Sequence, residues 1–446
     1  MTLAIVSRIL LVLLLAIGHV GLWVWLYNRI NATGFHRRTI KRIEKCIVLA
    51  CALIPVAILA LEFRSGNWGT DISEWTVTFC ERSLWGSTTY PTRVYGIAIL
   101  AFTVVIGPIW LAHRPAFAIA KHRFRILQKD VDPPMHRENP TWVSGSLTKQ
   151  CLKLPLNEIL SVERNIKQLM VERLPDGFSG MRIGHLSDIH LTGQLTADFY
   201  RLAVEWVMDQ RIEVLVVSGD IVDYKHAMGL LSPVFGNIDP SIPKIFVLGN
   251  HDRAYGLVDD VRLGLSELGW LDAGASDLNL QTERGLLKVC GNELPWLRRH
   301  DTNRNATEVA KDSAVMVESS THFLGRSVEQ GAFVLGISHS PDQFEWGRER
   351  GCHLLLCGHT HGGQIRFPWI GPLVAPSWYG SRYASGVFHR SPTLMHVSRG
   401  LSGVHPLRWG CTPEATVLEI VSELAQHGTH SANVYRSTEA IKSNRE

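Results

Sequence analysis

The chain has 446 residues, with 45 lysines and arginines against 41 aspartates and glutamates and a formal net charge of +4. This charge is too small to indicate nucleic-acid binding, and we expect no nucleic-acid partner. Eight cysteines occur without a C-x-x-C pair in a chain of this length, so we expect buried, reduced thiols and not a disulfide scaffold.

Three long apolar runs occur in the first quarter of the chain, at Ile9–Tyr27, Cys46–Phe63 and Tyr95–Ala112. Glu62 is their one charged residue. Each run is close to the ~20 residues that cross a hydrocarbon core, and tryptophans and tyrosines lie near several run ends. We therefore predict three transmembrane helices in residues 1–112. A cleaved signal peptide is the alternative for the first run, but it lacks a clear A-x-A site and two further runs follow it.

Basic residues in the short loops predict the orientation of a multi-pass membrane protein. Residues 28–45 carry six basic residues against one acid, whereas residues 64–94 carry three of each. Five more basic residues follow the third run, between 114 and 129. We predict that the first loop and everything after residue 112 lie in the cytoplasm, with the amino terminus outside. The basic flanks either attract anionic membrane lipids or only set the topology.

Residues 113–168 are mixed in character, with prolines at 133, 134, 140 and 155. We interpret them as a basic juxtamembrane linker, with a helix at Ala116–Gln128. Residues 426–446 form a polar tail for which we expect no stable structure.

From Met181 onward, short apolar runs end abruptly in polar residues, as in RIGHLSDIH, EVLVVSGD, KIFVLGNHD, FVLGISHS and HLLLCGHTH. Each run is typical of a buried strand. Apolar residues at helical spacing between Phe199 and Val207, and again between Val258 and Leu268, predict amphipathic helices. This alternation indicates an α/β domain, in which ligands gather at the carboxyl ends of strands.

The polar residues at these strand ends share the chemistry of metal ligands. They are Asp188, His190, Asp220, Asn250, His251, Asp252, His339, His359 and His361. One such residue alone is weak support, but five strand ends converge on the same chemistry. Imidazole and carboxylate ligands suit zinc, iron and manganese, and a pair of ions forms a clamp for displacement at phosphorus.

Individual roles follow from residue type and spacing. Asp220 is the candidate bridge between two ions, and the amide of Asn250 adds no charge to the ion that it binds. His251 can donate a proton or a hydrogen bond to a phosphate. We expect His359 and His361, which are one residue apart, to point in different directions, so that each can serve a different ion.

The ordered set D-x-H, G-D, G-N-H-D, H and G-H-T-H resembles the calcineurin-like metallophosphoesterase superfamily, from about Leu174 to Val421. The later segment VSRGLSGVHPLRWGCTPEATVLEI resembles the end of its membrane-associated branch. The resemblance implies a four-layer α/β/β/α sandwich, which we expect in residues 169–425, preceded by the α-helical transmembrane region.

The resemblance also implies roles for the site residues. One divalent ion would take Asp188, His190 and His361, and the other would take Asn250, His339 and His359, with Asp220 bridging. His251 would act on the phosphate, oriented by Asp252, and a bridging water would be the nucleophile. Manganese, iron, zinc and magnesium all fit such a site in part.

Two features depart from the family pattern. Residues 298–331 form a polar insertion that is either a substrate loop or a solvent-facing excursion. Gly291-Asn292-Glu293 stands where relatives often carry an acidic pair, which would alter the rim of the site but no ligand.

These observations predict a membrane-anchored two-metal phosphoesterase that hydrolyses a phosphodiester or pyrophosphate bond. Three hypotheses remain: a lipid-linked substrate such as UDP-2,3-diacylglucosamine, a broad-specificity phosphodiesterase or phosphatase tethered to the membrane, and a non-enzymatic sensor or scaffold. The three spans favour the first, because a soluble substrate gives no reason for them. The complete ligand set argues against the third.

Overall fold

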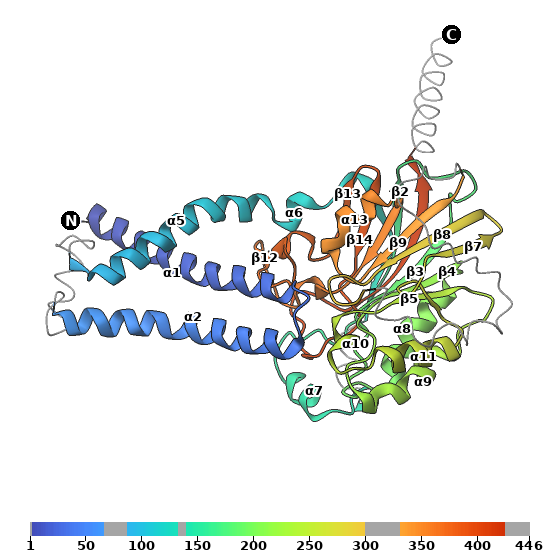
Figure 1. The fold of residues 1–446 in the computed structure, drawn as a ribbon, viewed down its shortest axis with the longest axis horizontal. Helices are drawn as coiled ribbons and strands as arrows, with labels where there is room; N and C mark the ends of the chain where they lie inside the picture. The colour runs from blue at the N-terminus through green and yellow to red at the C-terminus, as the bar shows by residue number, and fades with distance from the viewer. Residues whose placement is uncertain (1, 67–86, 133–139, 299–330, 424–446) are drawn as a thin grey trace, which may run out of the picture.

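The computed structural model describes residues 2–66, 87–132, 140–298 and 331–423, which form a helical stalk and an α/β domain (Figure 1). The tail at 426–446 lies outside the described residues, as does the insertion at 298–331 apart from its two end residues. The alternatives for that insertion therefore stay predictions.

The stalk contains three helices that are long and apolar enough to cross a membrane: α1 (Thr2–Asn31), α2 (Arg37–Ser65) and α5 (Tyr90–Ala112). His19 lies between them, with Nδ1 2.6 Å from the Tyr95 hydroxyl and Nε2 2.9 Å from the carbonyl of Cys51. The lone acid Glu62 accepts hydrogen bonds from the backbone N–H and the hydroxyl of Thr89, next to the start of α5. His19 and Glu62 thus each have partners that join one helix to another.

Two sheets form the centre of the α/β domain. The seven-stranded sheet has the order β1 (Phe124–Val131), β2 (Glu163–Val171), β15 (Glu414–Ser422), β3 (Arg182–Leu186), β4 (Val214–Ser218), β5 (Lys244–Val247) and β6 (Leu271–Asp272). The six-stranded sheet has the order β13 (Gly386–Arg390), β14 (Thr393–Val397), β10 (Leu354–Cys357), β9 (Phe333–Ser338), β8 (Gly285–Asn292) and β7 (Leu278–Thr282).

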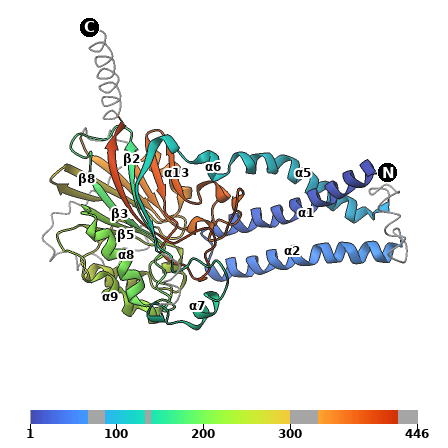
Figure 2. The same ribbon diagram turned by 180° about the vertical axis from the view of Figure 1, so that it is seen from behind.

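The sheets pack face to face through one apolar core, to which Ile183 and Val216 contribute from one sheet and Leu335 and Leu356 from the other. Helices α8 (Ala197–Asp209) and α11 (Val258–Glu267) cover the outer face of the seven-stranded sheet. Helix α13 (Phe344–Glu349) packs against the outer face of the six-stranded sheet (Figures 1 and 2). The expected four layers and both expected amphipathic helices are confirmed.

The segment before residue 169 differs from its prediction as a linker. The helix expected at Ala116–Gln128 is wrong: α6 spans only Pro115–Ala118, and the chain then enters the edge strand β1. β1 pairs antiparallel with β2, and β2 pairs in parallel with β15, so the boundary expected at 169 falls inside a strand. These hydrogen bonds join segments that are distant in sequence, and such tertiary pairing overrides local propensity.

The stalk meets the domain on one face, from which the three helices leave (Figure 2). Near the end of α1, the Asn28 amide donates to the carbonyl of Leu373 (3.1 Å) and accepts from the N–H of Ala375 (2.9 Å). In the loop between α1 and α2, the carbonyl of Gly34 accepts a hydrogen bond from Arg253 (3.1 Å). Arg253 belongs to α10 (Asn250–Ala254), directly after a strand end, so the stalk contacts the edge where the strands finish.

Candidate metal centre

The nine strand-end residues come from five connections at the carboxyl edges of the two sheets. They follow β3, β4, β5, β9 and β10 in turn. Five of them adopt left-handed backbone conformations, with φ of 47° at Asp188, 48° at His190, 53° at Asp220, 71° at His359 and 50° at His361. Such angles cost energy for residues with a Cβ and persist only where the surroundings hold them, which is common at functional sites.

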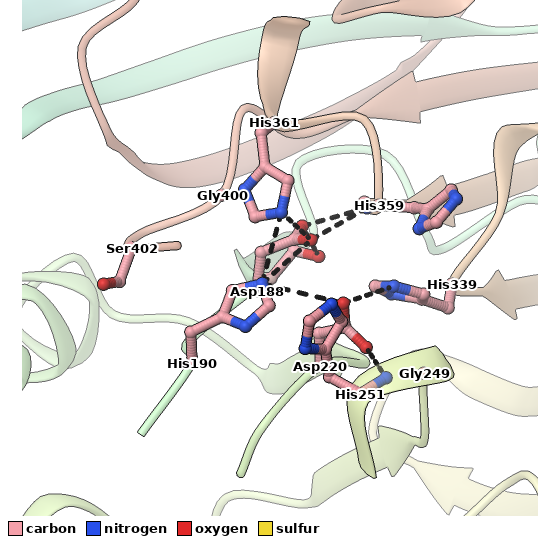
Figure 3. A network of polar contacts seen from close by, with 12 residues as sticks. Asp188, His190, Asp220, Gly249, His251, His339, His359, His361, Gly400 and Ser402 are labelled. Carbon is pink, nitrogen blue, oxygen red and sulfur yellow. Dashed lines mark hydrogen bonds and ion pairs between the residues drawn. The ribbon is translucent and has the colours of Figure 1, made fainter. Parts of the chain in front are cut away.

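One group of potential ligands consists of Asp188, His190, Asp220 and His361, whose ligand atoms all lie within 4.8 Å of one another (Figure 3). The Nε2 atom of His361 is 3.4 Å from the Asp188 carboxylate and 3.2 Å from Nε2 of His190. His190 Nε2 is in turn 3.6 Å from the Asp220 carboxylate. All four ligand atoms therefore point into the same space.

A second group consists of Asp220, His339 and His359, again with ligand atoms within 4.8 Å of one another. His339 Nε2 lies 3.1 Å from Oδ2 of Asp220. Asp220 is thus common to both groups, which is the position expected of a bridging carboxylate. The structure also separates His359 from His361 between the two groups, and both residues have left-handed φ, so the turn and not a strand alternation sets their directions.

Asn250 begins α10, and the next residue, His251, donates its backbone N–H to Oδ1 of Asp220 (2.8 Å). The side-chain oxygen of Asn250 is buried and has no hydrogen-bond partner among the residues that the structure describes. Nε2 of His359 is in the same state. Buried polar atoms without a partner are costly, and a cation would satisfy both.

The other nitrogen of two imidazoles is held by a partner outside the two groups. Nδ1 of His339 lies 2.7 Å from the carbonyl of Ser218, and Nδ1 of His190 lies 2.7 Å from the carboxylate of Asp223. A proton on each Nδ1 leaves the lone pair on Nε2 facing the carboxylates. This arrangement is the usual one for metal-binding histidine, and the donor set fits divalent ions such as manganese, iron or zinc.

The electrostatics of the two groups agree with this fit. Burial lowers the pKa of His361 and of His359 well below the ordinary value, so both imidazoles are neutral and able to bind a metal. Burial also acts on His339, but the nearby carboxylates, Asp220 before Asp188, together outweigh it and raise the pKa of His339 to about 9, so a metal ion bound there would displace the proton from Nε2. The imidazoles around Asp220 hold its pKa well below the ordinary value despite burial, so it stays ionised.

His251 lies beside these groups, with its ring centroid 4.8 Å from that of His190. Its Nδ1 contacts the carboxylate of Asp223, which therefore joins both imidazoles. Nε2 is left as the nitrogen that can act on a substrate. The side chain is 10% exposed, whereas that of His190 is fully buried, so His251 stands at the rim of the centre.

The orienting partner of His251 is Asp223 and not Asp252, which corrects the sequence prediction. The Asp252 carboxylate is occupied by backbone N–H groups, with Oδ1 2.9 Å from those of Ile221 and Val222 and Oδ2 2.8 Å from that of Gly249. It joins the turn after β4 to the turn that carries Asn250. The role of Asp252 is thus to hold two ligand-bearing turns together.

Sequence reasoning missed three residues that support the centre. Asp223 ends the motif SGDIVD, and its place three residues after Asp220 was the available signal. Trp296 lies after β8, with its ring centroid 4.7 Å from that of His359 and 5.4 Å from that of His339. Arg408 is fully buried and donates to the carbonyls of His361 (3.0 Å) and Arg399 (2.7 Å). No local pattern marks the last two.

Glu293, in the segment that departs from the family pattern, does not belong to either group of ligands. Its carboxylate accepts from the backbone N–H of Leu248 (2.7 Å) and from the guanidinium of Arg262 (2.5 Å). Burial raises the pKa of Glu293 to about 7 in spite of Arg262. Glu293 therefore stabilises the end of β5, and the departure leaves both groups of candidate ligands unchanged.

Comparison with known proteins places this geometry in context. Residues 181–363 match the family model described as calcineurin-like phosphoesterase, a stretch that contains every residue of both ligand groups. The chain is 28% identical over 272 residues to the metallophosphoesterase YkuE of Bacillus subtilis, covering 59% of this chain and 86% of that protein.

Two further relatives have names that state an activity. The phosphodiesterase YaeI of Escherichia coli is 26% identical over 250 residues, covering 55% of this chain and 84% of its own length. The UDP-2,3-diacylglucosamine pyrophosphatase LpxG of Chlamydia muridarum is 23% identical over 288 residues, covering 56% of this chain and 88% of its own length.

Proposed function

We propose that this chain, which carries a calcineurin-like phosphoesterase domain and is a metal-dependent phosphoesterase, hydrolyses a phosphodiester or pyrophosphate bond of a lipid-linked substrate at the membrane surface. The observation that carries the proposal is the contact between the stalk and the metal centre. The loop between α1 and α2 binds Arg253, two residues after His251, through the carbonyl of Gly34. A Cβ at Gly34 would lie 2.5 Å from the carbonyl oxygen of Pro295, so the same loop also packs tightly on the segment that carries Trp296.

Two divalent ions would be held by the two ligand groups, with Asn250 completing the second and Asp220 shared. When bound, they supply Lewis-acid chemistry at phosphorus. Asp223 holds His251 by Nδ1, so that Nε2 can donate a proton to the departing oxygen of the substrate. Trp296 covers the imidazoles of His339 and His359 on one side and limits the access of water to them.

A phosphate group of a membrane lipid would meet basic residues beside this centre. Arg37 and Lys41 lie in the first turns of α2 and are partly buried. Burial is the largest cause that lowers the pKa of His405, and the charges of Lys41 and Arg37 are the next largest. His251 also contributes to the lowering, so these groups lie near one another between the stalk and the domain. A phosphorylated headgroup would be attracted to this position, whereas its acyl chains would remain beside the helices.

The experiment compares a soluble and a lipid-linked substrate on one preparation of the full chain loaded with Mn²⁺. We expect cleavage of bis-p-nitrophenyl phosphate, and release of UMP from UDP-2,3-diacylglucosamine in detergent micelles. His251→Ala should lower both rates by about 10²–10⁴-fold, the usual contribution of general acid–base catalysis. Asp220→Asn should abolish both. Asp260→Asn, which alters an exposed carboxylate on α11, is the matched control and should behave as the unchanged protein.

Absence of UMP release at high enzyme concentration, with bis-p-nitrophenyl phosphate still cleaved, would contradict the lipid-linked substrate. Such a result would favour the alternative, a broad-specificity phosphodiesterase tethered to the membrane. The name of the relative YaeI, a phosphodiesterase, supports this alternative. Rates in both variants equal to those of the control would contradict the assignment of the centre itself.

The proposal places the catalytic domain on the cytoplasmic side of the membrane. Two observations support this side: residues 28–45 carry six basic residues against one acid, and the same loop contacts the domain through Gly34. A reporter fused after residue 446 should therefore behave as cytoplasmic. Periplasmic or luminal behaviour would overturn the orientation.

A further inference from the structure

A loop with several exposed apolar side chains follows the turn that carries His361. It contains the short strands β11 (Arg366–Phe367) and β12 (Gly371–Pro372), which pair antiparallel around a turn at residues 368–370. We call residues 366–380 the aromatic loop. Its exposed apolar residues are Phe367, Trp369, Ile370, Val374, Trp378 and Tyr379. Trp369 is fully exposed and Ile370 is 51% exposed. An exposed apolar patch of this kind marks an interaction surface.

The aromatic loop is fastened to the ends of two stalk helices. Arg114, two residues after α5, donates to the hydroxyl of Ser381 (2.9 Å) and contacts the carbonyl of Ile370. On the other side, the Asn28 amide of α1 binds the backbone of Leu373 and Ala375. Figure 1 shows β12 on the face of the domain from which the helices leave. The loop therefore has a fixed position beside the stalk.

Along the stalk helices, these contacts lie where we expect the interface between membrane and water. The guanidinium of Arg29 lies 3.9 Å from the ring centroid of Trp25 in α1, and that of Arg114 lies 4.3 Å from the ring centroid of Trp110 in α5. Tryptophans with neighbouring arginines are typical of helix ends at the headgroup region. Asn28 is three residues beyond Trp25, a rise of roughly 4.5 Å along a helix, so the loop is fastened within one turn of that level.

We propose that the aromatic loop inserts Trp369 and Ile370 into the headgroup region of the bilayer that the stalk spans. A lipid surface fits the patch because the patch continues an apolar surface that already belongs to the membrane. Phe117 of α6, which is 76% exposed, extends it beyond the end of α5. The basic residues after α5 suit an anionic leaflet.

Insertion has a consequence for the metal centre. Only Gly362, Gly363, Gln364 and Ile365 separate His361 from the aromatic loop, so lipid contact would hold the turn of that ligand at the membrane surface. This consequence rests on the proposed function, since it would present a lipid-linked phosphate to the ions. The insertion itself needs no substrate and can be tested without one.

The test uses the full chain in liposomes of phosphatidylethanolamine and phosphatidylglycerol, with a photo-crosslinking amino acid in place of Trp369. The matched control carries the same amino acid in place of Leu263, which is 50% exposed on α11, away from the stalk. Both positions are exposed, so neither change disturbs packing. After irradiation, mass spectrometry should find lipid adducts at position 369 at least about tenfold more often than at 263, as expected for an interfacial side chain.

Equal lipid adducts at the two positions would overturn the proposal. So would adducts at 369 that join two protein chains in place of lipid, because they would identify the loop as a contact between copies. A second measurement removes the apolar side chains in the variant Trp369→Ser, Ile370→Ser. The rate of this variant on bis-p-nitrophenyl phosphate should be unchanged. When the photo-crosslinking amino acid replaces Phe367, the variant should form fewer lipid adducts at that position than the protein that keeps Trp369 and Ile370. Failure of the lipid-linked substrate assay would leave all of these results unaffected, so the two proposals can fail separately.

Discussion

Replacement of Asp223 by asparagine tests the part of the centre that sequence reasoning did not identify. The Asp223 carboxylate lies 2.7 Å from Nδ1 of His190 with one oxygen and contacts Nδ1 of His251 with the other. It is buried, and the two imidazoles hold its pKa far below the ordinary value, against the effect of burial. Both oxygens of the carboxylate are therefore acceptors for imidazole N–H groups.

Asparagine keeps the shape of this side chain but replaces one acceptor oxygen with an NH₂ donor. One of the two imidazoles would then face a donor with its own N–H, and it would have to change tautomer or rotate. A carboxylate that orients a metal-binding histidine typically contributes 10–100-fold in metal affinity or activity, about 1.4–2.7 kcal/mol. Because Asp223 serves both His190 and His251, we expect a loss of about 100-fold or more in kcat/KM, together with weaker metal binding.

The assay combines hydrolysis of bis-p-nitrophenyl phosphate over a range of Mn²⁺ concentrations with metal analysis of the purified full chain. Asp223→Asn should need more Mn²⁺ for half-maximal activity and should remain slow at saturation. The first effect reports on His190 and the second on His251. Asp260→Asn is the control for loss of a carboxylate at an exposed position. An Asp223→Asn protein with unchanged Mn²⁺ dependence and unchanged kcat would refute the role of Asp223.

Three further predictions concern groups around the centre. Trp296→Ala should weaken metal binding by about tenfold because it uncovers the imidazole of His359, whereas Trp296→Phe should stay close to the unchanged protein; equal metal titrations for both would contradict this. Arg408→Met should lower the free energy of unfolding by at least about 2 kcal/mol, since it leaves the carbonyl of His361 and others buried without a donor; an unchanged melting temperature would argue against it. Burial, above all, lowers the pKa of His185 to about 3, so the native state binds fewer protons there than the unfolded state at pH 3–6.5 and stability falls as pH drops through this range. Between pH 7 and 5 this group should cost about 2 kcal/mol, and thermal unfolding of His185→Gln should lose that part of the pH dependence; equal slopes in both proteins would be inconsistent with a neutral buried imidazole.

The candidate metal ligands could be picked out from the sequence because each one follows a recognisable local pattern. An apolar strand that is followed at once by Asp, Asn or His can be recognised without knowing which segments lie beside it in space. Parallel strands then bring their carboxyl ends to one edge of the sheet. The same locality explains the error at Asp252. It is next to His251 in the chain, but successive residues of α10 point about 100° apart, so Asp252 turns away toward the backbone of Ile221 and Val222.

What the sequence did not predict depends on contacts between distant segments. Asp223 meets His190 across 33 residues of chain, and Arg408 meets His361 across 47. β1 is an edge strand with mostly exposed side chains, so it has no apolar alternation, and its hydrogen bonds to β2 define it as a strand. The contact of the α1–α2 loop with Arg253 is likewise invisible in either segment alone.

The most direct test of the two-metal centre is the metal content of the full chain, measured beside its activity. After removal of metal with EDTA and addition of Mn²⁺, the unchanged protein should hold two ions per chain and regain cleavage of bis-p-nitrophenyl phosphate. Asp220→Asn should hold fewer than two and remain inactive, because it loses the ligand that both groups share. Full activity in the metal-free protein, or two ions bound by Asp220→Asn with normal turnover, would contradict the account.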